Sequence, residues 1–281
     1  MTRIVCQQLA PVLGDLEANA ELTIAAITAA IDAGADVVVL PELATSGYMF
    51  DSMEEAAAVA IEPDHAVLAG WARVAARGGA VVIGGFAERG EDDRVYNSAA
   101  VFDGDRLVGV YRKCHLWDQE KRWFTPGAEP PRVLDTRQGR IGVLVCYDLE
   151  FPEMTRTLAL AGAQLIAVPT NWPYVPRPTG ERAPEVTIAM AAARSNRVFV
   201  ACCDRAGTER RQAWNQGTAI IDIDGWVVAS QPEIGSATGD VTLAAARDKS
   251  YTGLADAFAD RRPELYGAVT SSGPPGIEES R

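Results

Sequence analysis

Short apolar runs bounded by glycine and proline alternate with helical segments along this chain of 281 residues. The run at 36–40 is rich in valine and follows a stretch, 16–33, in which Ile24, Ile27 and Ile31 recur at helical spacing. An apolar run of this length that is rich in β-branched residues is typical of a strand buried on both faces of a sheet. The alternation of such strands with helices predicts an α/β fold.

The same patterns assign the rest of the chain. Besides the helix over 16–33, we expect helical structure over 52–77, 151–162 and 185–196. We expect strands over 3–9, 36–40, 80–88, 95–102, 107–111, 140–145, 164–168, 198–203, 216–223 and 226–230. Segments 114–131 and 169–184 contain several prolines and are predicted to be loops. Because no Pro-, Gly- or Ser-rich linker interrupts these elements, we predict one domain over 1–272 and a mobile tail over 273–281.

Composition and charge exclude several classes of protein. The 38 Asp and Glu residues exceed the 26 Lys and Arg residues, which disfavours nucleic acid or an anionic membrane as a partner because both attract basic surfaces. The apolar runs are strand-sized, whereas a membrane-spanning helix needs about 20 residues, and the first residues lack the pattern of a signal peptide. The five cysteines include no CxxC pair, which indicates reduced thiols rather than disulfides or a zinc site. We therefore expect a cytoplasmic protein.

Two segments of the chain resemble each other. AGADVVVLPE at 33–42 and AGAQLIAVPT at 161–170 each contain a helix end, a glycine, a short apolar run and a proline. The match is short and is equally consistent with chance or with two similar α/β halves that stack face to face. In the second case Glu42 and Thr170 lie at corresponding strand ends, where α/β proteins place their ligands.

The segment IGVLVCYDLEFPE at 141–153 predicts a strand that ends at Cys146 shortly before a helix begins. A thiol exposed at that strand end is close to the positive end of the helix dipole, which favours the reactive thiolate. The alternative is that Cys146 is a small core residue. Cys6, Cys202 and Cys203 lie within predicted strands and are interpreted as core residues, whereas Cys114 is left open.

A nucleophilic thiol usually needs a base. His65 lies in a helical segment and is interpreted as structural, while His115 follows Cys114 and leaves a Cys–His pair open. Glu42 directly follows a buried strand, where a carboxylate can serve as a base if partial burial raises its pKa. Lys113 closes another strand, and for both charged residues the alternative is a solvated strand end.

Three segments, PELATSGY at 41–48, YRKCHLW at 111–117 and VCYDLEFPE at 145–153, together resemble the signature regions of the nitrilase superfamily, the carbon–nitrogen hydrolases. The similarity extends from the first strand to about residue 222. The resemblance implies a four-layer αββα sandwich of two stacked mixed sheets, paired into a homodimer or a larger homo-oligomer. It also implies a catalytic set of Glu42, Lys113 and Cys146, with Glu120 of QEKRWFTPG as a second glutamate that holds Lys113 or the substrate amide.

Amide cleavage explains the role that the resemblance gives to each residue. Glu42 takes the proton of the Cys146 thiol, which attacks the carbonyl carbon. Lys113 and the backbone N–H of Tyr147 stabilise the oxyanion. The result is a thioester that water hydrolyses, and the implied mechanism needs no metal and no organic cofactor.

The residues after Cys146 bear on the identity of the substrate. Tyr-Asp after Cys146 resembles amidases more than nitrilases, and Glu150 stands where N-carbamoyl amino acid hydrolases carry arginines that bind a carboxylate. CYDLEFPE together with DRRPELY at 260–266 resembles the 5-aminopentanamidase branch, which implies a small linear amide with a distal cation. Glu150 either contacts that cation or caps the following helix. A nitrilase, an N-carbamoyl amine hydrolase and a non-catalytic binding or assembly protein remain the alternatives.

The pocket wall is predicted from the strand end of the second half. It should include Thr170, Asn171 and Trp172, with Tyr48 and Trp117 as further lining residues.

Overall fold

The computed structural model describes residues 1–231 and 233–271. The elements of its first part are β1 (Thr2–Gln8), α1 (Leu16–Asp32), β2 (Val37–Val39), α2 (Met53–Ala58), α3 (Ala66–Gly78), β3 (Val81–Arg89), β4 (Val95–Asp103), β5 (Arg106–Arg112), α4 (Glu120–Trp123), β6 (Val133–Thr136), β7 (Gly139–Val143) and the 3₁₀ turn η1 (Cys146–Glu150). They are followed by α5 (Pro152–Leu160), β8 (Leu165–Pro169), α6 (Pro184–Asn196), β9 (Phe199–Cys203), β10 (Thr208–Glu209), β11 (Gln212–Ala213), β12 (Thr218–Ile221), β13 (Val227–Gln231), β14 (Gly235–Val241) and the 3₁₀ turns η2 (Leu243–Arg247), η3 (Pro263–Leu265) and η4 (Gly267–Thr270).

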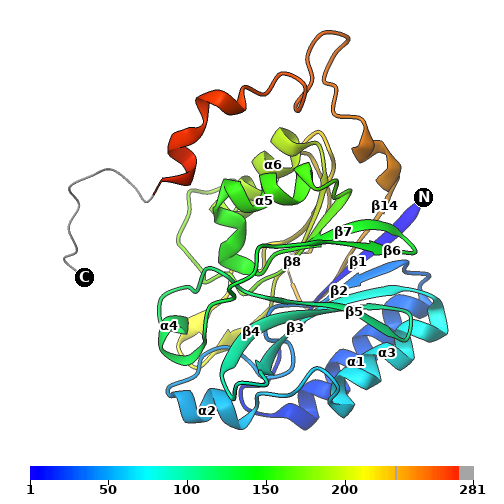
Figure 1. Cartoon of the computed structure of the whole chain (residues 1–281). Coiled ribbons are helices and arrows are strands. Elements are labelled where there is room, and N and C mark those ends of the chain that lie inside the picture. Colours follow the sequence, from blue (N-terminus) through cyan, green and yellow to red (C-terminus); the bar gives the residue numbers. More distant parts are fainter. Residues whose placement is uncertain (232, 272–281) are drawn as a thin grey trace. The chain divides into compact units, whose positions relative to one another are not determined.

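Two mixed sheets of six strands each are stacked between helices (Figure 1). The strand orders are β14–β1–β2–β3–β4–β5 and β13–β12–β9–β8–β7–β6. The strands β1, β2 and β3 run parallel in the first sheet, as do β7, β8 and β9 in the second. Helices α1 and α3 cover the outer face of the first sheet, and α5 and α6 cover that of the second (Figure 1). This arrangement confirms the predicted four-layer αββα sandwich.

The ends of the main helices follow from local sequence. The Asp15 carboxylate accepts the N–H of Ala18 and caps α1, and α5 and α6 begin at Pro152 and Pro184. Proline suits the first helical position because its missing N–H would have no partner there. These three helices agree with the predicted segments.

Other elements differ from the prediction. The expected helical stretch at 52–77 is two helices, α2 and α3, because Pro63 in the connection between them cannot continue a helix. The predicted loop at 114–131 contains the short helix α4. Strands β6 and β14 were not predicted; β14 buries only Ala237, Gly239 and Val241, which is too weak an apolar alternation to detect.

The two similar segments occupy matching positions in the two sheets. Gly34 follows α1 and Gly162 follows α5, each with a positive φ (83° and 89°) that glycine adopts without steric cost. Each glycine leads into a parallel strand, β2 or β8. The carboxyl ends of these strands meet, because the Asn171 side chain donates to the main-chain oxygen of Glu42 at 2.9 Å. The interpretation as two stacked halves is therefore supported.

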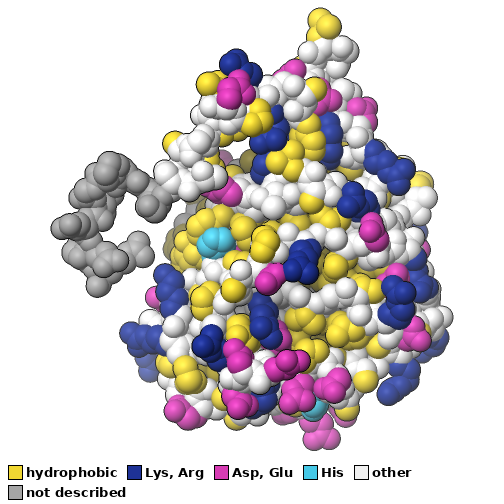
Figure 2. Space-filling model, viewed as in Figure 1, with side chains coloured by type: hydrophobic (Ala, Val, Ile, Leu, Met, Phe, Trp, Pro, Cys, Tyr) yellow, Lys and Arg dark blue, Asp and Glu magenta, His cyan; other side chains and the backbone are white. Residues whose placement is uncertain are grey.

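Contacts divide the described chain into two compact units, 1–248 and the residues from 249 onward. The first contains both sheets; the second contains η3 and η4, and the DRRPELY motif lies in it. The single domain over 1–272 remains a prediction, and the predicted tail at 273–281 lies outside the described residues. Within the described residues, no helix combines the length and the apolar character needed to cross a bilayer. Acidic and basic side chains are interspersed over the face shown in Figure 2.

Candidate active site

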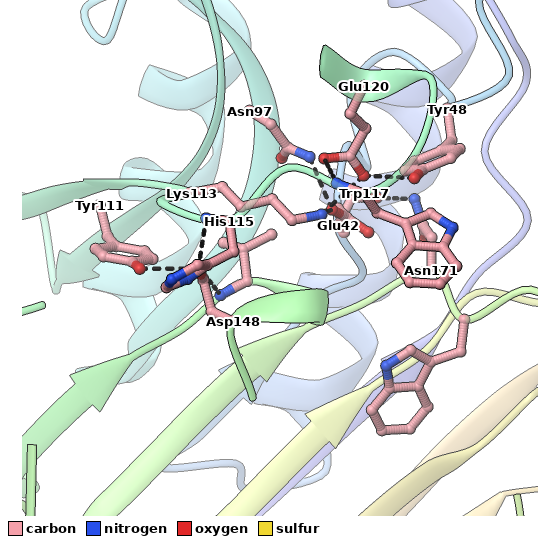
Figure 3. Close-up of polar contacts among 12 residues, drawn as sticks. Glu42, Tyr48, Asn97, Tyr111, Lys113, His115, Trp117, Glu120, Asp148 and Asn171 are labelled. Atoms are coloured by element: carbon pink, nitrogen blue, oxygen red, sulfur yellow. Dashed lines mark hydrogen bonds and ion pairs between the residues drawn. The ribbon is translucent and has the colours of Figure 1, made fainter. Parts of the chain in front are cut away.

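Glu42, Lys113 and Glu120 form a buried charged cluster (Figure 3). The Lys113 Nζ donates to Oε1 of Glu42 and to Oε1 of Glu120, both at 2.7 Å. Glu42 and Lys113 are fully buried, and Glu120 is 3% exposed. Removing such charges from water costs more than a well-packed apolar cluster would, so a buried ion pair is weak evidence for a stabilising role. The cluster is therefore a candidate for chemistry.

The local backbone determines where the cluster lies. Glu42 follows β2 and passes so close to β3 that a Cβ on Gly85 would lie 2.5 Å from Glu42 Cα and 2.4 Å from Leu43 N. Lys113 directly follows β5, and its N–H donates to the main-chain oxygen of Asn97 on β4 at 2.8 Å. The two charged residues thus extend from strand ends of the first sheet, as predicted.

Two neutral side chains orient the carboxylates. Asn97 Nδ2 donates to Glu42 Oε1 at 2.7 Å, so this oxygen receives two donors while Glu42 Oε2 is buried without a hydrogen-bond partner. The Tyr48 hydroxyl donates to Glu120 Oε1. Tyr48, predicted as a substrate-binding residue, therefore also holds the second glutamate beside Lys113.

Burial and mutual charge set the protonation of the cluster. Burial, with a smaller contribution from Glu120, raises the pKa of Glu42 to about 7, against the opposing effects of Lys113 and Asn97. For Lys113, burial works in the other direction, but the charges of Glu120 and Glu42 raise its pKa above the usual value. Lys113 therefore remains protonated at neutral pH, whereas Glu42 gains or loses its proton close to pH 7.

Cys146 begins the 3₁₀ turn η1 with a positive φ of 48°, a conformation that costs a non-glycine residue on the order of 1–3 kcal/mol. The residue is only 5% exposed, so the predicted exposed thiol is wrong. The predicted bias toward the thiolate is also wrong: burial and the charge of Glu42 raise the pKa of the Cys146 thiol well above its ordinary value, although Lys113 and Thr170 lower it. The helix dipole is outweighed by desolvation because the thiol is buried.

The possible Cys–His pair is not formed. His115 Nδ1 lies 2.8 Å from Oδ1 of the fully buried Asp148, and the imidazole stacks on Phe151 with ring centroids 3.7 Å apart. His65 forms the N-cap of α3, where its Nδ1 accepts the N–H of Val67 at 3.3 Å, which supports its structural interpretation.

Thr170, Asn171 and Trp172, predicted as pocket wall, all lie buried directly after β8. Asn171 Oδ1 and Trp172 Nε1 are buried without a hydrogen-bond partner, whereas the Thr170 side chain lies close enough to the Cys146 thiol to lower its pKa through a hydrogen bond. The carboxylate of Asp204 accepts the main-chain N–H of Trp172 at 2.9 Å and fixes this segment. Two unpartnered buried polar atoms beside a residue that faces the thiol are the pattern expected of a wall that faces a ligand.

A cavity of 350 Å³ borders the charged cluster at Glu120 and Tyr48, and this volume suits a small ligand. Its lining includes the aromatic residues Tyr48, Phe50, Trp117, Trp123 and Trp214. The Trp117 ring is edge-on to that of Tyr147, the residue after Cys146, at 4.8 Å between centroids. Of Glu42, Lys113, Glu120 and Cys146, only Glu120 lines the 350 Å³ cavity, and none of the four lines a larger cavity of 710 Å³ beside β5.

Glu150 ends η1 and is exposed, and like Glu42 and Cys146 it does not line the cavity beside Glu120. Burial and the charge of Glu185 raise the pKa of Glu150, whereas the Lys113 ammonium lowers it, so Glu150 lies within electrostatic reach of the charged cluster.

Asn97, which bonds to Glu42, and Asp148, which bonds to Tyr111, His115 and Val145 beside Lys113 and Cys146, were missed by the sequence analysis. A buried asparagine within the apolar strand β4, and an aspartate two residues after Cys146, were the available signals.

A buried carboxylate, ammonium and thiol at strand ends of an αββα sandwich define a class of enzyme that cleaves bonds through an acylated cysteine. Residues 3–251 match the family model described as carbon-nitrogen hydrolase. A nitrilase from Pyrococcus abyssi is 35% identical over 95% of this chain and 99% of that protein. The N-carbamoylputrescine amidase of Solanum lycopersicum is 30% identical over 90% of this chain and 89% of that protein.

A solved amidase from Nesterenkonia sp. AN1 has the same fold, with a TM-score of 0.78 and 28% identity over 95% of this chain and 98% of that one. A Glu→Gln variant of that amidase shows Michael addition of acrylamide at its active-site cysteine. The chain belongs to the carbon–nitrogen hydrolase family, within the nitrilase superfamily. It is an enzyme that hydrolyses carbon–nitrogen bonds.

Proposed function

We propose that the enzyme is an amidase that converts a small linear primary amide to a carboxylate and ammonia through a thioester on Cys146. One observation carries the preference for amides: Glu42 Oε2 and Asn171 Oδ1 are buried acceptors without partners. The Asn171 amide nitrogen is identified because it must donate to the Glu42 carbonyl. A primary amide offers two N–H donors, whereas a nitrile offers none. Leaving each acceptor unpaired costs about 1–3 kcal/mol, which favours the amide.

The proposed reaction begins with proton transfer from the Cys146 thiol to Glu42, as the sulfur attacks the carbonyl carbon. Lys113 and the N–H of Tyr147 stabilise the oxyanion, and removing one such donor costs about 10²–10³ in rate in known enzymes. Glu42 then returns the proton to the amide nitrogen, the C–N bond breaks and ammonia leaves. Glu42 next removes a proton from water, which attacks the thioester; the carboxylate is released and the thiol is restored.

The protonation states support this sequence of steps. The raised pKa of the Cys146 thiol keeps it neutral at rest, so its proton must be removed during the attack. A carboxylate that titrates at about 7, as Glu42 does, is poised to accept and return that proton at neutral pH. Glu120 orients the Lys113 ammonium, and its own position is held by Tyr48.

The distal end of the substrate is proposed to carry a cation, as in 5-aminopentanamide. Burial and the charge of Glu185, in the first turn of α6, raise the pKa of Glu150. This mutual repulsion is relieved when an ammonium lies between or beside the two carboxylates. The alternative role of Glu150 as a helix cap has no support, because the start of α5 has no side-chain capping bond.

An N-carbamoyl amine is the second candidate substrate. N-carbamoylputrescine, in the name of the tomato relative, also ends in an amine, and its carbamoyl group presents the same C(=O)NH₂ donors to Glu42 and Asn171. The two acidic residues Glu150 and Glu185 suit both compounds equally.

A panel of pentanamide, 5-aminopentanamide, a 5-carboxypentanamide, N-carbamoylputrescine and pentanenitrile tests the proposal by ammonia release and product identification. We expect turnover of amides, preference for the 5-amino compound, and loss of activity in Cys146→Ala. Faster hydrolysis of the nitrile would refute the amidase assignment, and preference for the carboxy compound would refute the distal cation. Equal inertness of wild type and Cys146→Ala would favour the non-catalytic alternative.

The proposal includes assembly of the enzyme as a homodimer in the cytoplasm, which the family resemblance suggests. Light scattering at several protein concentrations tests the assembly, and a monomeric mass throughout would contradict it.

A further inference from the structure

The Asp148 carboxylate joins the segment around Lys113 to the turn that carries Cys146 (Figure 3). Its Oδ1 accepts the main-chain N–H of His115 at 2.9 Å and lies 2.8 Å from His115 Nδ1. Its Oδ2 accepts the Tyr111 hydroxyl at 2.9 Å and the main-chain N–H of Val145 at 3.2 Å. Asp148 is fully buried, so each of its two oxygens depends on these protein donors rather than on water.

Asp148 and its side-chain donors lie close in sequence to Lys113 and Cys146. Tyr111 and His115 stand two residues before and two residues after Lys113, and Asp148 stands two residues after Cys146. One carboxylate therefore ties both sides of the lysine to the turn that carries the thiol. The two segments belong to different sheets, since Lys113 follows β5 and Cys146 follows β7.

We propose that Asp148 is a positioning residue that sets the distance between the Lys113 ammonium and the Cys146 turn, including the N–H of Tyr147. This inference rests on the proposed function, because these two donors stabilise the oxyanion there. The positive φ of Cys146 directs the thiol and the following N–H, and the Asp148 bond to Val145 closes that turn. Without the bridge, the ring contacts of Trp117 with Tyr147 and of His115 with Phe151 still join the two segments, but the hydrogen bonds of Asp148 no longer fix the distance between Lys113 and the turn.

The main test is Asp148→Asn, which keeps the shape but replaces one accepting oxygen by an amide that donates. Whichever oxygen is replaced, one main-chain N–H, that of His115 or that of Val145, then faces a donor, so either the lysine segment or the cysteine turn is released. We expect kcat to fall about 10²-fold, the loss known for a displacement of about 1 Å at a reacting centre. The affinity for the product carboxylate, measured as a competitive inhibition constant, should change less than about threefold, because positioning for the oxyanion is not needed to bind product.

Tyr111→Phe and His115→Phe remove one side-chain donor each and keep the carboxylate. Each should lower kcat less than Asp148→Asn does, and the double variant should lose less than the product of the two single losses, because both donors act through one carboxylate. Tyr96→Phe is the matched control: Tyr96 is a buried tyrosine whose hydroxyl donates to an aspartate, Asp92, at 2.9 Å. Its kcat should equal that of the wild type.

An unchanged kcat in Asp148→Asn, or a loss that appears only as weaker product binding, overturns the proposal. If Asp148→Asn does not fold, the Tyr111→Phe/His115→Phe double variant decides, and wild-type kcat in it also overturns the proposal. If the wild type hydrolyses no amide, the proposed function has failed, and the bridge is tested by the rate of Cys146 alkylation with iodoacetamide. Because Lys113 lowers the pKa of this thiol, slower alkylation in Asp148→Asn supports the bridge and an unchanged rate refutes it.

Discussion

Replacing Asn97 by leucine should move the pH dependence of catalysis without abolishing it. Asn97 donates to Glu42 Oε1 at 2.7 Å in a fully buried setting and thereby stabilises the ionised carboxylate. A hydrogen bond to a charged group contributes about 1.5–3 kcal/mol, and about 1.36 kcal/mol corresponds to one pKa unit. Loss of the bond should therefore raise the pKa of Glu42, which is about 7 in the wild type, by about one to two units.

The sign and size of the effect on rate follow directly. Glu42 must be ionised in the free enzyme, so kcat/KM rises with pH through the pKa of this carboxyl. At pH 7 the wild type is about half ionised, and with a shift of about one unit the variant is roughly one-tenth ionised. We expect kcat/KM of Asn97→Leu to be about fivefold lower than that of the wild type at pH 7 and to approach the wild-type value at about pH 9, about two pH units higher.

The assay is ammonia release at subsaturating amide from pH 5 to pH 10. Asn196→Leu serves as the control, because Asn196 is also buried and its amide bonds to Ala192 within α6. If kcat/KM of Asn97→Leu is lower by the same factor at every pH, and the pH at which it rises is unchanged, Asn97 does not act through Glu42. The reasoning would also be refuted if the control variant Asn196→Leu showed the same shift of the pH at which kcat/KM rises.

Three other perturbations test the site. The buried carboxyl of Glu42 has a raised pKa, about 7 instead of 4.5, so the wild type loses up to about 3 kcal/mol of stability as the pH rises through that window. Glu42→Gln has no such loss, so its melting temperature should exceed that of the wild type by a margin that grows from pH 4.5 to about 7. A difference in melting temperature that does not change with pH would contradict this. Gly85→Ala should lower kcat/KM about 10²-fold, because its Cβ would displace the Glu42 backbone, whereas Gly253→Ala, with open space around it, should leave kcat/KM unchanged. Tyr48→Phe should lower kcat about tenfold, measured by initial rates, because it removes the hydroxyl that donates to Glu120. Full activity in this variant would show that the Tyr48 ring contributes only by packing.

Much of the fold could be predicted from local patterns. Burial of apolar side chains by itself produces the valine-rich run at 37–40 and the helical spacing of Ile24, Ile27 and Ile31. The structure places these residues in β2 and its end and in α1, as expected. Strand β14 was missed because Ala237 and Val241 are its only buried apolar side chains, whereas the strand is fixed by pairing with β1, a partner at the distant start of the chain.

The sequence by itself determined which residue types could carry the chemistry and that Glu42, Lys113 and Thr170 stand at strand ends. Only the tertiary structure decided their protonation and their partners, because a pKa depends on burial and on charges from distant segments. Cys146 is the clearest case: its neighbours in sequence favour a thiolate, whereas burial and the charge of Glu42 keep the thiol protonated. The same holds for Asn97 and Asp148, whose contacts with Glu42 and with the segment around Lys113 exist only once separate strands have come together.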